Sequence, residues 1–102
     1  MPLRTIIGID RHARDFIGRS PFLVISTADA DGWPDASPRG DAPGFVAVVD
    51  DKQLHVPDRP GNNRLDSFQN LLTNPRIALL FLLPGRLGEA IVAFAQSLAR
   101  SQ

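Results

Sequence analysis

The sequence contains no cysteine, which excludes a disulfide framework, a zinc site built on thiolates and a cysteine nucleophile. Lysine and glutamate are almost absent, with only Lys52 and Glu89, so arginine and aspartate carry nearly all of the charge. The 11 basic and 11 acidic residues balance, and zero net charge argues against a general binder of nucleic acid or of acidic membranes. The longest unbroken apolar run, 77–83, is far shorter than a membrane-spanning helix.

A chain of 102 residues fits a single domain, and an apolar content of 43% is enough to build a folded core. We therefore expect one domain over residues 1–102. The two histidines, His12 and His55, have no cluster of histidine, aspartate or glutamate at ligand spacing around them, so no metal site is predicted. No signal-type apolar segment precedes the first charges at the N-terminus, which predicts a cytoplasmic protein.

Glycine, proline and aspartate divide the chain into short apolar segments, which is typical of strands joined by tight turns. A short helix is expected at 10–17, with Asp10 as its cap and Gly18 at its end. Residues 29–32 have the composition of a hairpin turn, and Pro34 places the returning strand near a sheet edge. The strands are expected at 22–27, 33–37, 45–49, 54–56 and 77–83, with a rigid loop at 38–44.

Two further helices are expected. The first begins at Asn62 or Asn63, carries leucine and phenylalanine on one face and ends before Pro75. The second lies in the tail, 87–102, whose apolar residues recur at helical spacing. About five short strands with peripheral helices predict a small β-barrel.

The segment 57–64, Pro-Asp-Arg-Pro-Gly-Asn-Asn-Arg, places a glycine-bearing loop at the N-terminus of an expected helix. The first amides of a helix have no internal partner and the helix dipole adds positive charge, so a phosphate fits there. Arg59 and Arg64 would add charge-assisted hydrogen bonds, and Asn62 or Asn63 a side-chain donor. The alternative is an ordinary capped helix whose arginines lie in solvent or pair with nearby aspartates.

Ser37, Pro38, Arg39 and Gly40 come at the end of the second expected strand. They combine a hydroxyl, a fixed kink, a guanidinium and a residue that lets a ligand approach the backbone. These groups could hold the polar edge of a planar ligand or its phosphate. The alternative is a turn without a ligand, and codon usage explains the general preference for arginine without any function.

Several short motifs follow one another along the chain, and their order identifies a protein family more specifically than any single motif does. It runs Ser-Pro-Phe-Leu-Val-Ile-Ser-Thr-Ala at 20–28, Ser-Pro-Arg-Gly at 37–40, Pro-Gly-Phe at 43–45, the 57–64 segment, Asn-Leu-Leu-Thr-Asn-Pro at 70–75 and Ile-Ala-Leu-Leu-Phe at 77–81. In this order, over about residues 14–86, the sequence resembles the pyridoxamine 5′-phosphate oxidase-like flavoproteins. The resemblance implies an α+β, mainly β fold, a partial split β-barrel of antiparallel strands with peripheral helices.

The resemblance also implies an FMN site. Its first part, along the flavin ring and ribityl chain, would be Ser37, Pro38, Arg39 and Gly40. Its second part would be backbone contacts at the strand end formed by Val56, Pro57 and Asp58. Its third part, around the phosphate, would be Arg59, Asn62, Asn63 and Arg64, in agreement with the helix-terminus argument.

The function implied is FMN-dependent redox chemistry on a small molecule, in a homodimer with FMN at the subunit interface. FMN carries the chemistry in such proteins, so no catalytic residue is expected from the sequence. Two alternatives stay open: a non-catalytic flavin- or phosphate-binding module, and a truncated stub that acts only through oligomer or partner association. The second arises because the barrel strands that follow in the family are expected to be missing after Arg86, with the 87–102 helix in their place.

Overall fold

A computed structural model describes residues 1–57, 74–85 and 89–98 of the chain. In these residues one helix and seven strands occur, and all strands belong to one antiparallel sheet. In sheet order the strands run β3-β2-β6-β7-β1-β5-β4, so that β3 and β4 form the two edges. The elements are β1 (Pro2–Thr5), α1 (Arg11–Arg19), β2 (Phe22–Ala28), β3 (Pro34–Gly40), β4 (Ala47–Asp50), β5 (Gln53–His55), β6 (Arg76–Leu82) and β7 (Ala90–Ser97).

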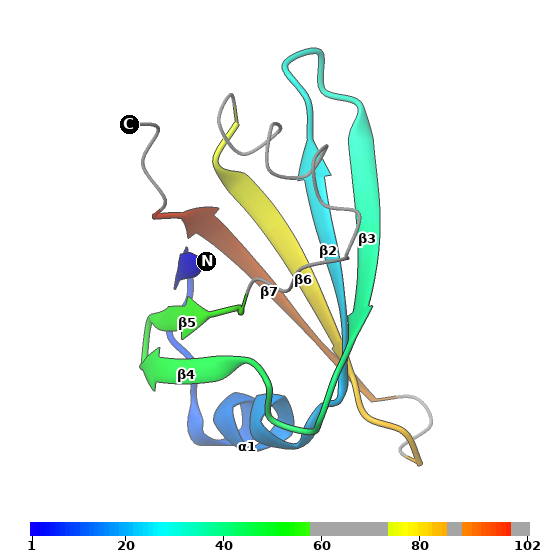
Figure 1. Cartoon of the computed structure of the whole chain (residues 1–102). Helices are drawn as coiled ribbons and strands as arrows, with labels where there is room; N and C mark the ends of the chain where they lie inside the picture. The colour runs from blue at the N-terminus through cyan, green and yellow to red at the C-terminus, as the bar shows by residue number, and fades with distance from the viewer. Residues whose placement is uncertain (58–73, 86–88, 99–102) are drawn as a thin grey trace.

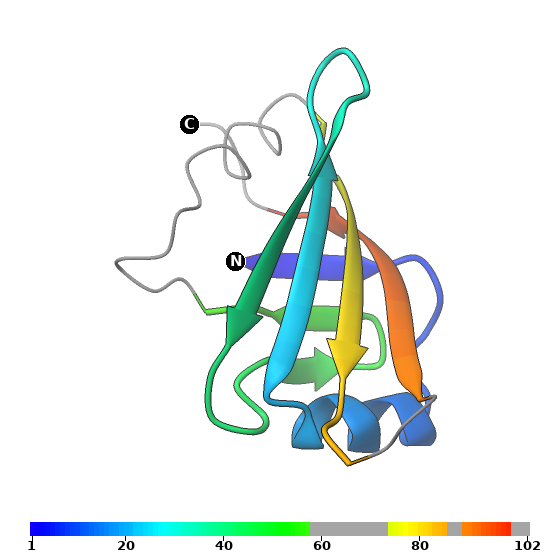
Figure 2. The same ribbon diagram turned by 90° about the vertical axis from the view of Figure 1, so that its right-hand side faces the viewer.

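The sheet curls into a partial barrel. The long strands β2, β3 and β6 stand side by side, and β1, β4 and β5 lie across them at a steep angle (Figures 1 and 2). Strand β7 connects the two halves, because it pairs with β6 on one side and with β1 on the other. Helix α1 lies across one end of the barrel (Figures 1 and 2). This is the α+β, mainly β fold with a partial split β-barrel that the sequence predicts.

The core lies on the inner face of this curled sheet. In β2, burial alternates strictly, with Leu23, Ile25 and Thr27 inside and their neighbours half-buried. Such alternation follows from the period of two between side chains that share a strand face. The inner face of the sheet and α1 together bury Leu3, Ile9, Phe16, Ile17, Leu23, Ile25, Val46, Leu54, Val56, Ile77, Leu79, Phe81 and Ala95.

Helix α1 begins as predicted. The carboxylate of Asp10 accepts a hydrogen bond from the backbone N–H of Ala13 at 2.8 Å, which satisfies one of the free amides of the first turn. Gly18 does not end the helix, which continues to Arg19. Ser20 follows as the cap; it is 2% exposed, and its hydroxyl lies within hydrogen-bonding distance of the carbonyl oxygens of both Phe22 and Leu82. Ser20 therefore joins the helix end to the two central strands.

The tail is the main correction to the sequence-based prediction. Ala90–Ser97 forms strand β7 instead of the helix expected over 87–102, so one of the strands expected to be missing after Arg86 is present. The apolar residues of this segment fit a helical period, yet Ile91, Ala93 and Ala95 also repeat every second residue. Two neighbouring strands hydrogen-bond to β7, and this tertiary pairing outweighs local spacing.

Smaller differences concern the strand ends. The hairpin at 29–32 forms, with Gly32 at a φ of +86°, and β3 is an edge strand as Pro34 predicts. Pro38 and Gly40, expected in a loop, belong to β3 instead; an edge strand tolerates proline because one of its sides has no hydrogen-bonding neighbour. The N-terminal strand β1 has no counterpart in the prediction.

Candidate functional site

The predicted Ser37–Gly40 motif lies on the last four residues of the edge strand β3. In the register with β2, Ser37 lies opposite Ile25 and Arg39 lies opposite Leu23. Because Ile25 and Leu23 belong to the core, Ser37 and Arg39 also point to the inner face of the sheet. Pro38 and Gly40 point the other way and are exposed. The structure therefore separates the four motif residues into an inner pair and an outer pair.

Arg39 is the buried arginine of this motif, with 7% of its surface exposed. By contrast, the other arginines of the described strands, Arg4 and Arg76, are exposed. A guanidinium is costly to remove from water unless polar groups surround it, so a buried arginine marks a position with a specific polar role. Arg39 carries a planar, permanently charged guanidinium into this part of the barrel.

The second part of the predicted site lies at the end of β5. Val56 is fully buried, and its backbone N–H donates to the carbonyl oxygen of Met1 at 2.9 Å. The N-terminal amine of Met1 in turn donates to the carbonyl oxygen of Val56 at 2.7 Å. The first of these hydrogen bonds takes up the N–H of Val56, and Pro57, which is half-buried, has no N–H to offer.

The C-terminal ends of β3 and β5 lie at the same level of the molecule in both views (Figures 1 and 2). The two strand ends belong to different halves of the sheet and lie apart from each other in Figure 1. The remaining predicted site residues lie outside the described residues: Asp58, Arg59, Asn62, Asn63 and Arg64. The helix expected from Asn62 or Asn63 lies outside them too.

Both histidines are exposed on regular elements of the fold. His12 is exposed on α1, with its ring centroid 6.5 Å from that of Phe16. His55 is exposed on β5, and its Nε2 lies 3.3 Å from the amine of Met1. Within the described residues, no three histidine or acidic side chains come together as a possible metal site.

One arrangement of polar side chains is not apparent from the sequence. Asn74 and Arg76 lie at the start of β6, beside a cleft whose floor is made by small residues of two strands. No linear pattern signals this cleft, because Ser26 and Ala78 are distant in sequence and become neighbours only through the pairing of β2 with β6.

The curled antiparallel sheet with a helix across one end defines the class, a partial split β-barrel. A family model described as pyridoxamine 5′-phosphate oxidase matches residues 9–96, and the chain belongs to this family. Among solved structures, a HupZ variant from Group A Streptococcus superimposes with a TM-score of 0.58 at 23% sequence identity. The match covers 78% of this chain and 60% of that one, so this chain spans less than two thirds of the HupZ chain.

No curated protein matches the chain in sequence. In the part of the chain that the structure describes, no helix is long and apolar enough to cross a membrane.

Proposed function

We propose that this protein binds FMN and uses it for redox chemistry on a small molecule. The observation that carries the proposal is the buried Arg39 on the edge strand of a chain from the pyridoxamine 5′-phosphate oxidase family. A buried guanidinium beside the Ser37 hydroxyl suits a ligand that is planar and rich in hydrogen-bond acceptors. FMN, when bound, supplies the electron transfer, and the protein binds, orients and shelters it.

The proposed flavin contacts are Ser37, Pro38, Arg39 and Gly40. Among the described strands, β3 has a neighbour on one side only, and an edge strand offers backbone N–H and C=O groups on its other side to a ligand. A Cβ added at Gly40 would meet the carbonyl oxygen of Pro21 at 3.6 Å, which is ordinary contact, so packing against the described residues does not require glycine here. Close approach of a ligand to the backbone is the role we propose for it.

The proposed phosphate end lies beyond β5. Val56, Pro57 and Asp58 would provide backbone contacts, and the bond with Met1 limits Val56 to the second lone pair of its carbonyl oxygen. The phosphate contacts proposed are Arg59, Asn62, Asn63 and Arg64. They rest on the sequence, in which two arginines flank a glycine-bearing loop at a predicted helix N-terminus.

The first test is the visible absorbance of the freshly purified chain, followed by titration with FMN. We expect flavin absorbance, either as purified or after FMN is added. A colourless protein that also fails to quench the fluorescence of added FMN overturns the proposal. Reduction of the bound flavin by a nicotinamide cofactor supports an oxidoreductase, whereas bound flavin that no such donor reduces indicates a non-catalytic flavin module.

The second test concerns the phosphate. The double variant Arg59→Gln/Arg64→Gln is expected to weaken FMN by about tenfold or more and riboflavin far less, because riboflavin lacks the phosphate. The matched control is Arg11→Gln/Arg14→Gln, which removes two exposed arginines of α1. Equal losses of FMN and riboflavin affinity would refute the phosphate assignment while leaving the flavin proposal standing.

We also propose that the protein forms a homodimer, from family membership, and that it works in the cytoplasm, from the sequence of its N-terminal segment. Sedimentation equilibrium at several protein concentrations tests the first point against the 11.1 kDa mass of one chain. A mass of one chain throughout, with FMN present, would contradict the dimer.

A further inference from the structure

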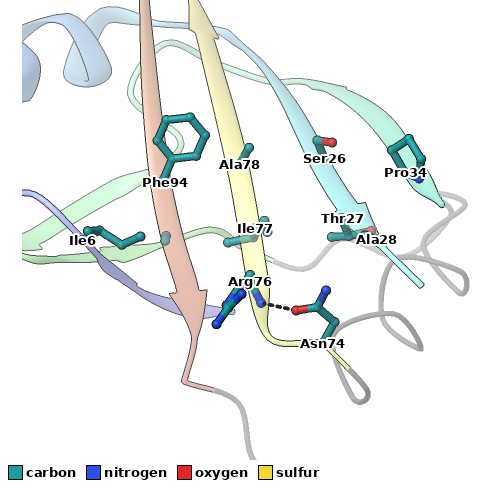
Figure 3. A pocket seen from close by; sticks show the side chains of 11 residues that line it. Ile6, Ser26, Thr27, Ala28, Pro34, Asn74, Arg76, Ile77, Ala78 and Phe94 are labelled. Carbon is teal, nitrogen blue, oxygen red and sulfur yellow. Dashed lines mark hydrogen bonds between the residues drawn. The ribbon is translucent and has the colours of Figure 1, made fainter. Parts of the chain in front are cut away.

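A cleft of about 320 Å³ opens on the outer face of the sheet, across β2, β6 and β7 (Figure 3). Its floor is formed by Ser26 and Ala78, which are cross-strand partners with small side chains. Phe94 stands on one side of this floor and Pro34 on the other (Figure 3). The volume is at the lower end of the range for small-molecule sites, about 300–1,000 Å³, and suits a ligand with a single ring.

The cleft ends where the small residues end. In the next row of the same face, Val24, Leu80 and Val92 are paired across the three strands and their larger side chains fill the surface. The cleft is therefore bounded at this end by apolar side chains. Phe94 remains 59% exposed, so one face of its ring is available for stacking by a flat apolar group.

The other end of the cleft is polar and carries donors. The Oδ1 atom of Asn74 accepts a hydrogen bond from the backbone N–H of Arg76 at 3.2 Å, which leaves the NH₂ group of Asn74 to donate outward. The guanidinium of Arg76 is exposed and forms no ion pair with any described residue. None of the residues that line the cleft is acidic, so this end is positively charged.

A second arginine strengthens the positive charge of this region. Gln96 of β7 pairs with Arg76 on one side and with Arg4 of β1 on the other, and all three are exposed on the outer face. The two arginines are not direct cross-strand partners, but both add positive charge to the same row of the outer face.

We propose that this cleft binds a small planar carboxylate. The ring lies against Phe94 over Ala78, and the carboxylate accepts a bidentate pair of hydrogen bonds from Arg76 with support from the Asn74 amide. The cleft lies on the opposite face of the sheet from Ser37 and Arg39. Pro38 and Gly40 share its face, but they pair with Val24 and Phe22, in and beyond the row of larger side chains, and neither of them lines the cleft. The proposal therefore does not depend on FMN binding.

The test is a titration of the ¹⁵N-labelled full chain with benzoate, followed by amide chemical shifts in NMR spectra. We expect saturable shifts confined to residues of β2, β6 and β7 around the cleft. Benzamide, which has the same ring but no charge, is expected to bind at least about tenfold more weakly than benzoate. This difference is the contribution of a charge-assisted pair of hydrogen bonds.

Two variants remove the two halves of the site, and each has a matched control. Arg76→Gln is expected to lower benzoate affinity about tenfold, and Arg14→Gln, an exposed arginine on α1, to leave it unchanged. Ala78→Leu fills the floor of the cleft and is expected to abolish binding, whereas Ala47→Leu on the exposed edge strand β4 leaves it intact. Arg76 is exposed, so its variant keeps the test valid even if the Ala78 variant folds poorly.

Three results of the binding experiments overturn the proposal. The first is equal binding of benzoate and benzamide, the second is equal loss of affinity in Arg76→Gln and Arg14→Gln, and the third is a set of shifts located away from the cleft. A doubling of mass that Phe94→Ala abolishes would also overturn it, because this face would then be covered by a second copy of the chain.

Discussion

Arg39 lies directly opposite Leu23 in the register of β2 and β3, and both side chains point to the inner face of the sheet. Leu23 is fully buried and Arg39 is 7% exposed, so a permanent charge shares the interior with the apolar core. Such a position is maintained only if the surroundings stabilise the guanidinium and its apolar stem packs against its neighbours. The relationship makes Arg39 a structural residue as well as a proposed ligand contact.

Replacement of Arg39 by alanine is expected to lower the free energy of unfolding by about 1–3 kcal/mol, because both the polar contacts and the packing of the stem are lost. Urea unfolding followed by circular dichroism measures the effect. The control, Arg14→Ala on the exposed face of α1, should stay within about 0.5 kcal/mol of the unchanged protein. Indistinguishable unfolding midpoints for the two variants would contradict the inward placement of Arg39.

Strand β7 provides a sharper test, because adjacent residues have opposite environments. Ala95 is 2% exposed on the inner face, and Ala95→Glu is expected to cost at least about 3 kcal/mol by burying a carboxylate without a cationic partner. Gln96 is exposed between Arg4 and Arg76, and Gln96→Glu is expected to stabilise the fold by about 0.2–1 kcal/mol through opposite-charge cross-strand pairs. Thermal unfolding of both variants measures the contrast.

The same pair of variants also distinguishes a strand from the helix that local spacing favours. Raised salt should reduce the gain from Gln96→Glu, because exposed charges are screened, while the loss from Ala95→Glu persists. Destabilisation by both substitutions, or by neither, would be inconsistent with alternation along β7.

Residues with a strong local signal were placed well by the sequence. Asp10 caps α1, Gly32 adopts the positive φ of a hairpin, and the apolar run at 77–83 is the central strand β6. In each of these the residue itself determines the local backbone, through a side-chain cap, a missing Cβ or continuous apolar character. Tertiary structure then adds little to the prediction.

The prediction failed where the local structure depends on residues distant in sequence. Ala90–Ser97 became a strand through pairing with β6 and β1, and the sequence of β7 alone does not reveal those partners. Two features on which the sequence makes no prediction also depend on strand pairing. The burial of Arg39 follows its register with Leu23, and the N–H of Val56 is taken by Met1, which lies 55 residues earlier in the chain. The sequence therefore predicts which residues belong to the candidate site. Only the fold shows which of them face the interior of the sheet.

The cap of α1 is expected to have a measurable share in stability. Asp10→Ala removes the acceptor for the Ala13 N–H and should lower the free energy of unfolding by about 1 kcal/mol. Asp10→Ser keeps a capping oxygen and should restore most of that loss. The control is Asp15→Ala, which removes only the exposed i,i+4 pair with Arg19 and should cost about 0.5 kcal/mol or less. Comparable losses for Asp10→Ala and Asp15→Ala would argue against the cap.

The loop between β3 and β4 approaches α1 so closely that it requires glycine. Gly44 has a φ of +78°, its N–H donates to the carbonyl oxygen of Ser20 at 3.2 Å, and an added Cβ would lie 2.7 Å from the carbonyl oxygen of Gly18. Gly44→Ala therefore combines an unfavourable backbone conformation with a collision against main-chain atoms, which cannot move aside as a flexible side chain would.

The hairpin residue Gly32 separates these two causes. Its φ of +86° resembles that of Gly44, but no atom lies within 4 Å of an added Cβ. Gly32→Ala should therefore cost only the conformational term, about 1–2 kcal/mol, and Gly44→Ala at least about 1 kcal/mol more from the collision. Urea unfolding of the two variants gives the difference directly. Equal losses would mean that the loop moves away from α1 without cost, and the close contact between Gly44 and Gly18 would then contribute nothing to holding the helix across the end of the barrel.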